Sequence, residues 1–162
     1  YSNQIRVKSS HFQFHSDRTC FVGVDPLVGV SKADYTQFRA LAEYLPFKDR
    51  IFDHVVFATS LDHFVDPLPA LQEAIRVCKI NGEIDIWVGE KSPDAINPDI
   101  SPEWYNVLKK PDKAEDVFHL KRLNNSSILA LVEELGLTIA DMEVHIVDKY
   151  RKNFFYKLKV TC

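Results

Sequence analysis

Residues 45–67 constrain the fold more than any other part of the chain. The segment opens on Leu45-Pro46-Phe47, which predicts a tight turn, and continues into an apolar run of strand length over residues 53–58. A short loop follows, and Pro67 or Pro69 then stands in the first turn of a helix, where proline is tolerated. This order of turn, strand, loop and helix is one unit of an α/β sheet, and such sheets bind ligands where their strands end.

Further strands are predicted on both sides of this unit. Residues 20–24 form an apolar run that Asp25-Pro26 ends as a turn, and residues 35–41 alternate as a second strand. Downstream, apolar residues at helical spacing extend to Cys78, and Asn81-Gly82 predicts the C-cap of that helix. Residues 83–88 alternate again and predict the next strand of the sheet.

The second half of the chain adds one helix and a hairpin. Residues 91–123 are rich in proline and charge, and predict either a lid or a small helical insertion. Asn124 or Asn125 then caps a helix that Gly136 ends. Residues 142–147 and 154–160 are strands joined by a short polar link, which predicts an antiparallel hairpin. We therefore expect a single α/β domain over residues 1–162, with a mostly parallel sheet and a C-terminal antiparallel hairpin.

Composition excludes several classes of function. The 162 residues carry a formal net charge of −3 without a basic stripe, so we expect no nucleic-acid partner. No apolar run approaches the ~20 residues that span a bilayer, so we expect no membrane association. Cys20, Cys78 and Cys162 form no CxxC pair, and the first residues do not read as a signal peptide, which together favour a reducing, cytoplasmic location. The oligomeric state is left open.

The chain resembles the class I S-adenosylmethionine-dependent methyltransferases of the type 11 kind. Leu45-Pro46-Phe47, Phe52-Asp53 before the apolar strand, and Leu61-Asp62-His63 before the helix all resemble that family's central pattern. Val22-Gly23-Val24-Asp25-Pro26 also resembles its acid-ended strand. The resemblance implies a Rossmann-like sheet, the cofactor S-adenosylmethionine, and transfer of a methyl group to a small-molecule acceptor.

The resemblance also implies which residues would hold the cofactor. Asp25, followed by Pro26, would accept hydrogen bonds from the ribose hydroxyls, although an Asp-Pro pair is equally a turn former without a ligand. Leu41 and Ala42 would flank the adenine. Leu41 stands where the family often has an acid, and Leu45-Pro46-Phe47 would mainly pack a buried turn. The crevice itself would be lined by Ala58, Thr59 and Leu61, at the end of their strand.

Candidates for chemistry beyond cofactor binding are few. Methyl transfer depends mostly on orientation, and a base is needed only when the acceptor must lose a proton. His63 is the candidate base, and its alternative role is packing beneath the start of the helix. Trp104 and Tyr105 are candidates to line an acceptor pocket or to form the core of a lid. No residues have the sequence spacing of metal ligands, so we expect no metal site.

One family motif is absent from the sequence. The glycine-rich loop that follows the family's first strand has no counterpart, because none of the five glycines precedes residues 20–24. That first strand is central in the family, and without it the sheet would split into two parts with unpaired edges. Residues 4–7 are the one upstream candidate for the slot. Either the loop is degenerate or residues that belong before Tyr1 are missing.

These features leave alternatives to an enzyme open. A methyltransferase-like domain that has lost cofactor binding could serve as a partner or regulatory module, and the absent glycine loop favours that alternative. A nucleotide-binding α/β domain of another family is a third alternative, although no phosphate-cradling loop supports it.

Overall fold

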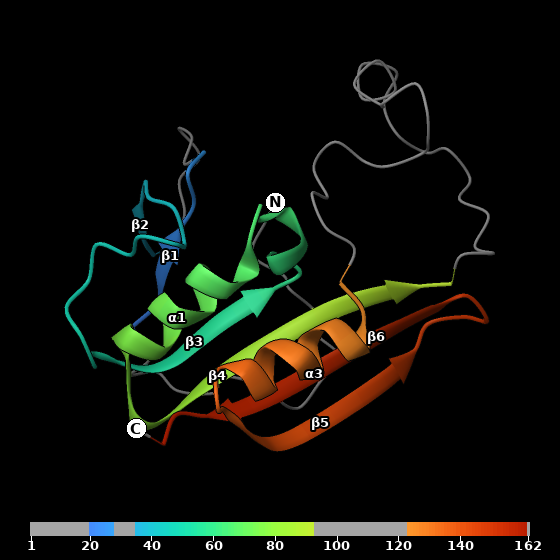
Figure 1. The fold of residues 1–162 in the computed structure, drawn as a ribbon. Coiled ribbons are helices and arrows are strands. Elements are labelled where there is room, and N and C mark those ends of the chain that lie inside the picture. The colour runs from blue at the N-terminus through green and yellow to red at the C-terminus, as the bar shows by residue number, and fades with distance from the viewer. Residues whose placement is uncertain (1–19, 28–34, 93–122, 162) are drawn as a thin grey trace.

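The structure is a computed structural model that describes residues 20–27, 35–92 and 123–161. It contains a two-stranded sheet in the order β1-β2 and a four-stranded sheet in the order β3-β4-β6-β5 (Figure 1). The strands are β1 (Val22–Val24), β2 (Thr36–Phe38), β3 (Phe52–Ala58), β4 (Cys78–Lys91), β5 (Thr138–Ile146) and β6 (Arg151–Lys159). The helices are α1 (Pro67–Val77) and α3 (Asn125–Glu134), with a 3₁₀ turn, η2, at Leu61–His63.

Strand directions confirm the predicted α/β fold and its hairpin. Strands β1 and β2 are parallel, as are β3 and β4, while β6 runs antiparallel to both β4 and β5. The hairpin strand β6 therefore lies inside the sheet, between β4 and β5. Within the described ranges, no strand pairs with both β1 and β3, and the predicted candidate for that slot, residues 4–7, lies outside them.

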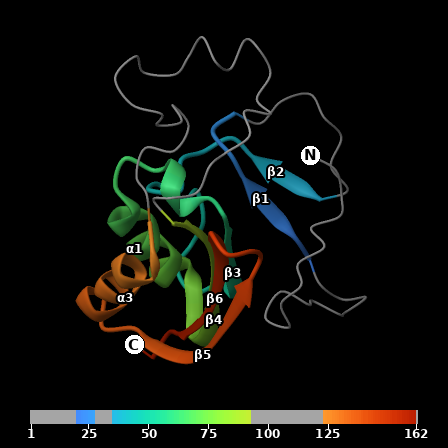
Figure 2. The same cartoon turned by 90° about the vertical axis from the view of Figure 1, so that its right-hand side faces the viewer.

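Both helices cover the same face of the four-stranded sheet (Figures 1 and 2). Alternate residues of β4 and β6 point to that face and form the core with the inward sides of the helices. The fully buried members include Ile84, Ile86, Tyr156, Leu158, Ala70, Ala74 and Ile128. In the described part of the chain, neither helix has the length and apolar character needed to cross a bilayer.

Three predicted helix ends are confirmed, and α1 also has an N-cap, Asp66, that was not predicted. The Asp66 carboxylate accepts a hydrogen bond from the Leu68 amide at 3.2 Å, with Pro67 in the first turn of α1. Asn124, the first of the two candidates, accepts the Ser127 amide at 2.9 Å and caps α3. Gly136 follows α3 with a φ of +62°, a left-handed conformation that glycine adopts without steric cost.

The predicted end of α1 is wrong. The helix stops at Val77, and Cys78 is already the first residue of β4. The amides of Arg50 and Ile51 donate to the carbonyls of Arg76 and Val77, each at 2.9 Å, which satisfies carbonyls that a longer helix would have used.

Asn81-Gly82 instead forms a bulged turn inside β4, where the register with β3 shifts. Asn81 has a φ of +65°, the left-handed conformation that the residue after a helix also adopts. A Cβ on Gly82 would lie 2.6 Å from Cys78 Sγ and 2.9 Å from the Asp53 carbonyl oxygen, so the turn is too tight for any other residue. Asn81-Gly82 therefore does change the direction of the chain, as its sequence indicates, but it does so within β4 and not at the end of α1.

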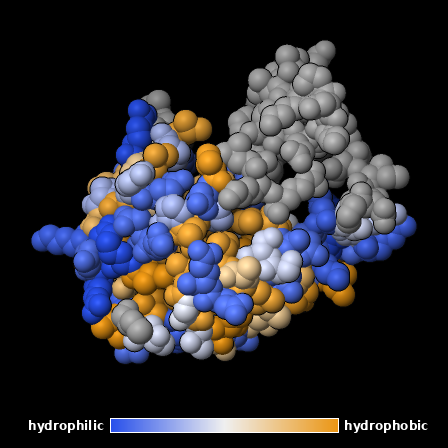
Figure 3. All heavy atoms as spheres, viewed as in Figure 1, coloured by the Kyte–Doolittle hydropathy of each residue, from blue (hydrophilic) through white to orange (hydrophobic). Residues whose placement is uncertain are grey.

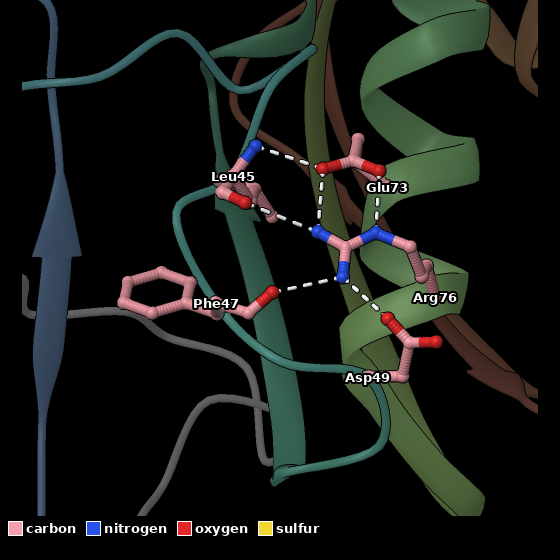
Figure 4. A network of polar contacts seen from close by, with 5 residues as sticks. All are labelled: Leu45, Phe47, Asp49, Glu73 and Arg76. Atoms are coloured by element: carbon pink, nitrogen blue, oxygen red, sulfur yellow. Dashed lines mark hydrogen bonds and ion pairs between the residues drawn. The ribbon is translucent and has the colours of Figure 1, made fainter.

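A single arginine ties the Leu45-Pro46-Phe47 turn to α1 (Figure 4). Arg76 donates to both carboxylate oxygens of Glu73, at 2.6 and 2.7 Å, and to Asp49 at 2.6 Å. It also donates to the carbonyls of Phe47 and Leu45, at 2.8 and 3.0 Å. All five guanidinium N–H groups are thereby used. Glu73 completes the network by accepting the Leu45 amide at 2.8 Å.

The turn so fixed joins the two sheets. The ring of Phe47 meets Phe38 of β2 edge-on with centroids 5.1 Å apart, and meets Phe52 of β3 in the same way at 5.0 Å. Such edge-to-face pairs stabilise beyond their buried area. The packing role expected of Leu45-Pro46-Phe47 is therefore visible in Phe47, which connects the small sheet to the large one.

We predict that Arg76→Lys lowers the free energy of unfolding by about 1–3 kcal/mol, because lysine cannot reproduce the planar five-donor fork. Arg151→Lys is the matched control: Arg151 pairs with Asp148 at 2.7 Å but is 53% exposed. Exposed pairs contribute about 0.2–1 kcal/mol, so this control should change little. Urea denaturation of both variants measures the difference, and equal losses would contradict the role given to Arg76.

Acid should weaken the same network. The hydrogen bond from Arg76 holds the pKa of Glu73 below its ordinary value. A lowered carboxyl pKa contributes stability that is complete above the unfolded pKa of about 4.3 and is lost as the pH falls through the folded pKa. The stability advantage of the wild type over Glu73→Gln should therefore be constant near neutrality and shrink below about pH 4. Denaturation of both proteins at several pH values tests this, and a constant difference would refute it.

Candidate functional site

Asp25 stands immediately after β1, as predicted, and its carboxylate is held in a local turn. Its amide donates to the Phe38 carbonyl at 3.1 Å, which joins the ends of β1 and β2. Oδ1 accepts the Leu27 amide at 2.6 Å. This turn is what the alternative interpretation of Asp25-Pro26 expected, and it orients the carboxylate while leaving Oδ2 as a further acceptor.

Leu41 and Ala42 lie between β2 and the Leu45-Pro46-Phe47 turn. Leu41 is 50% exposed, and its carbonyl accepts the Tyr44 amide at 3.1 Å. Ala42 is partly buried and packs against the main core. The pair thus presents an apolar side chain to solvent beside a fixed backbone, which suits contact with a flat ring more than recognition of a polar group.

Thr59 has the most unusual backbone of the predicted site residues. It follows Ala58 at the carboxyl end of β3 and has a φ of +53°. A β-branched residue in this region is a genuine outlier, and such strain collects at ligand sites. The Thr59 amide donates to the Trp87 carbonyl at 3.0 Å, so pairing with β4 maintains the conformation.

Leu61 and His63 occupy the 3₁₀ turn η2 that connects β3 to α1. Leu61 is fully buried in the core, so its side chain serves packing and only its backbone could face a ligand. The His63 side chain is 41% exposed, and its Nε2 lies 3.8 Å from Asp62 Oδ1. The imidazole is therefore accessible and stands beside a carboxylate, an arrangement compatible with either role predicted for it.

The predicted acceptor residues, Trp104 and Tyr105, lie outside the described residues, as do residues 4–7 and nearly all of the predicted lid at 91–123. An open hollow of about 410 Å³ lies between α1 and α3, bordered by Asp66, Leu123 and Leu131. It is on the helix-covered face, where hydrophobic residues appear in separate patches among hydrophilic ones (Figure 3). None of the predicted cofactor residues lines this hollow.

One polar cluster was not predicted. His54 of β3 meets Glu83 and Asp85 of β4, with their ligand-type atoms all within 4.8 Å of one another. Glu83 and Asp85 lie two residues apart on β4, but His54 is distant from them in sequence, and pairing of β3 with β4 brings it beside them. Sequence spacing does not predict this cluster, because the sequence of one strand does not determine its register with the next.

Comparison with protein families identifies part of the chain. Residues 21–86 match the family described as a methyltransferase domain. Two curated relatives, the ubiquinone/menaquinone biosynthesis C-methyltransferases UbiE of Xylella fastidiosa strains M23 and Temecula1, are 40% identical over 65 residues. This alignment covers 38% of the chain but only 25% of each relative's length. The family resemblance seen in the sequence is thus confirmed over this segment.

Solved structures confirm the fold. A SAM-dependent methyltransferase from Methanosarcina mazei aligns with a TM-score of 0.61 over 86% of this chain and 81% of its own, at 14% identity. The [4+2]-cyclase SpnF aligns with a TM-score of 0.55 over 78% of this chain and 57% of its own, at 17% identity. The structural alignments establish the class I methyltransferase fold, and sequence identities this low leave the reaction open.

Strain at Thr59 predicts an unusual response to glycine. Thr59→Gly should leave the free energy of unfolding unchanged or raise it by up to about 1 kcal/mol, because relief of the left-handed strain offsets the greater freedom of unfolded glycine. Thr138→Gly, at the exposed start of β5, is the matched control and should be destabilising by roughly 0.5–1 kcal/mol. Similar losses in both variants, measured by thermal unfolding, would show that Thr59 is unstrained.

Proposed function

Since residues 21–86 match the methyltransferase domain family within a class I methyltransferase fold, we propose that the chain binds S-adenosylmethionine and transfers its methyl group to a small-molecule acceptor. The observation that carries the proposal is one of position. Every described candidate for cofactor binding, from Asp25 to Leu61, falls within the matched segment. Asp25 and Thr59 follow the carboxyl ends of parallel strands, where such sheets bind ligands.

Asp25 is proposed to hold the ribose. The carboxylate of an ionised aspartate offers about four lone-pair sites, and the Leu27 amide occupies one of them. The remaining acceptors suit two neighbouring hydroxyl groups. Pro26 would fix the chain direction directly after this contact.

Leu41 and Ala42 are proposed to flank the adenine. The exposed Leu41 side chain offers an apolar surface to one face of the ring, and Ala42 offers its backbone at the ring edge. The hydrogen bonds of Arg76 hold the Leu45-Pro46-Phe47 turn that follows these two residues, so the segment needs little ordering when a ligand binds.

Ala58, Thr59 and the Leu61 backbone are proposed to border the rest of the cofactor. When bound, S-adenosylmethionine would supply an electrophilic methyl group on a cationic sulfur: the acceptor would bond to the methyl carbon in line as the methyl–sulfur bond breaks, and the demethylated product would leave as a neutral thioether. The task of the protein is then to align donor and acceptor and to exclude water. His63 would take a proton only from an acceptor that must lose one. Trp104 and Tyr105 are proposed to contact the acceptor.

The proposed setting is the cytoplasm. Cys20 and Cys78 are both free thiols in the described structure, which suits a reducing compartment. The Cys78 thiol is buried, and its pKa is raised to about 11, chiefly by desolvation, so it remains protonated and unreactive at neutral pH.

Calorimetric titration with S-adenosylmethionine and its demethylated product tests the cofactor role. We expect Asp25→Asn to keep the local turn but to weaken binding about 10- to 100-fold, as expected for lost hydrogen bonds to a charged acceptor. Asp148→Asn is the matched control, because Asp148 accepts the amide two residues ahead, at 2.8 Å, in the β5–β6 hairpin. Unchanged affinity in Asp25→Asn would refute the ribose-binding role of Asp25. No binding of millimolar ligand to the wild type would refute the proposal that the chain is an S-adenosylmethionine-dependent enzyme.

A second function is favoured by a separate observation. The family's glycine-rich loop has no counterpart in the sequence, and among the described strands β1 pairs only with β2 and β3 only with β4. An inner edge of a sheet that has no strand of its own chain beside it can accept a strand from another protein. The chain would then be a methyltransferase-like partner module without cofactor, and absence of ligand binding in the titration would favour it.

A further inference from the structure

The sheet face opposite the helices carries a cluster of three metal-ligand side chains. Register pairs His54 of β3 with Glu83 of β4. Asp85 lies two residues beyond Glu83 on the same strand, so the alternation of side chains places it on the same face. His54 Nδ1, a Glu83 oxygen and an Asp85 oxygen all lie within 4.8 Å of one another.

Asp85 is a buried carboxylate that lacks hydrogen bonds. Its exposed fraction is 0%, and neither of its oxygens accepts a hydrogen bond in the described structure. Burying a carboxylate without hydrogen bonds is costly, and the charged neighbours of Asp85 are Lys157 and the His54 imidazole, whose Nδ1 lies 3.5 Å from Oδ2. A carboxylate in this position gains more from a cation than one in water does, because the interior screens the attraction less.

The distances fit a metal ion better than hydrogen bonds. His54 Nδ1 lies 3.5 Å from Glu83 Oε2 and 3.5 Å from Asp85 Oδ2. Hydrogen bonds from nitrogen to oxygen usually span 2.7–3.2 Å. A tetrahedral zinc site with bonds of about 2.1 Å has ligand atoms about 3.4 Å apart, close to both of these separations.

Each oxygen of Glu83 has a lysine neighbour, and the longer of the two contacts is at Oε2, the oxygen that lies 3.5 Å from His54 Nδ1. Lys159 Nζ pairs with Oε1 at 2.7 Å. Lys157 Nζ lies 3.3 Å from Oε2 and is the cation that an incoming metal would displace.

Access to the cluster is open from one side. His54 and Glu83 line an open hollow of about 290 Å³, and the His54 side chain is 42% exposed. A water molecule could therefore complete the coordination. His54 precedes Ala58 by four residues, which places the cluster roughly 13 Å along β3 from the proposed cofactor crevice.

We infer that His54 Nδ1, Glu83 Oε2 and Asp85 Oδ2 form a binding site for a divalent transition-metal ion of the Zn²⁺ class, with water as the fourth ligand. One imidazole with two carboxylates suits Zn²⁺, whereas Ca²⁺ and Mg²⁺ prefer oxygen ligands alone. The ion would compensate the buried charge of Asp85 and tie β3 to β4. This role is structural and independent of methyl transfer.

Zinc titration of the chelator-treated full chain tests the inference by calorimetry and thermal unfolding. We expect Zn²⁺ to raise the unfolding midpoint and Mg²⁺ to leave it unchanged. Asp85→Asn should weaken zinc binding at least tenfold while folding at least as well without metal, since it removes a buried charge. Lys157→Met should tighten binding, because it removes the competing cation.

Matched controls separate this site from adventitious binding. His145 and Glu143 of β5 form a similar pair, at 3.4 Å, without a buried third carboxylate, so His145→Gln should bind zinc as the wild type does. Co²⁺ should give a spectrum without a thiolate charge-transfer band, which excludes the cysteines as ligands. An unchanged midpoint with Zn²⁺, or equal affinity in Asp85→Asn and the wild type, would overturn the inference.

Discussion

The Arg76 guanidinium is the interaction on which the arrangement of the described structure depends. It binds Glu73 on its own helix, and Asp49 with the carbonyls of Leu45 and Phe47 on the loop before β3 (Figure 4). Carbonyls in a loop need partners when they leave water, and one side chain supplies two of them here. The loop can therefore take a single conformation without forming regular secondary structure.

Alternation along β4 gives the four-stranded sheet two different faces. Ile84, Ile86 and Val88 point toward the helices and supply much of the core. Glu83 and Asp85 point to the opposite face, beside the lysines of β6. The same strand thus builds an apolar interior and a charged cluster, and moving its register by one residue would exchange them.

Local signals explain what could be predicted from the sequence. Strand β3, the proline start of α1 and the Asn124 cap depend on residues close together, so their patterns identify them. The end of α1 depends on Arg50 and Ile51, which donate to its last carbonyls from the other side of the loop. No pattern within the helix contains that information, and the nearby Asn81-Gly82 turn supplied a misleading stop signal.

The candidate sites divide in the same way. Asp25 and Thr59 could be predicted because they follow apolar strands, although the left-handed backbone of Thr59 could not. The cluster of His54, Glu83 and Asp85 depends on register between β3 and β4, and on burial that appears only after folding. Candidate site residues that follow the end of a strand can therefore be predicted from a single sequence. Candidates that are brought together by pairing between strands cannot.

The geometry of the proposed cofactor crevice depends on Phe47. Asp25 is held by its own turn and Thr59 by its hydrogen bond to Trp87, so both candidate residues are fixed without a ligand. Among the described strands no hydrogen-bonded pairing connects β1 with β3. The ring pairs of Phe47 with Phe38 and with Phe52 connect the small sheet to the large one, and ring pairs hold a distance less strictly than a strand ladder does. A ligand that contacts both Asp25 and Thr59 would therefore bind residues that are already ordered, and would itself fix the distance between the two sheets.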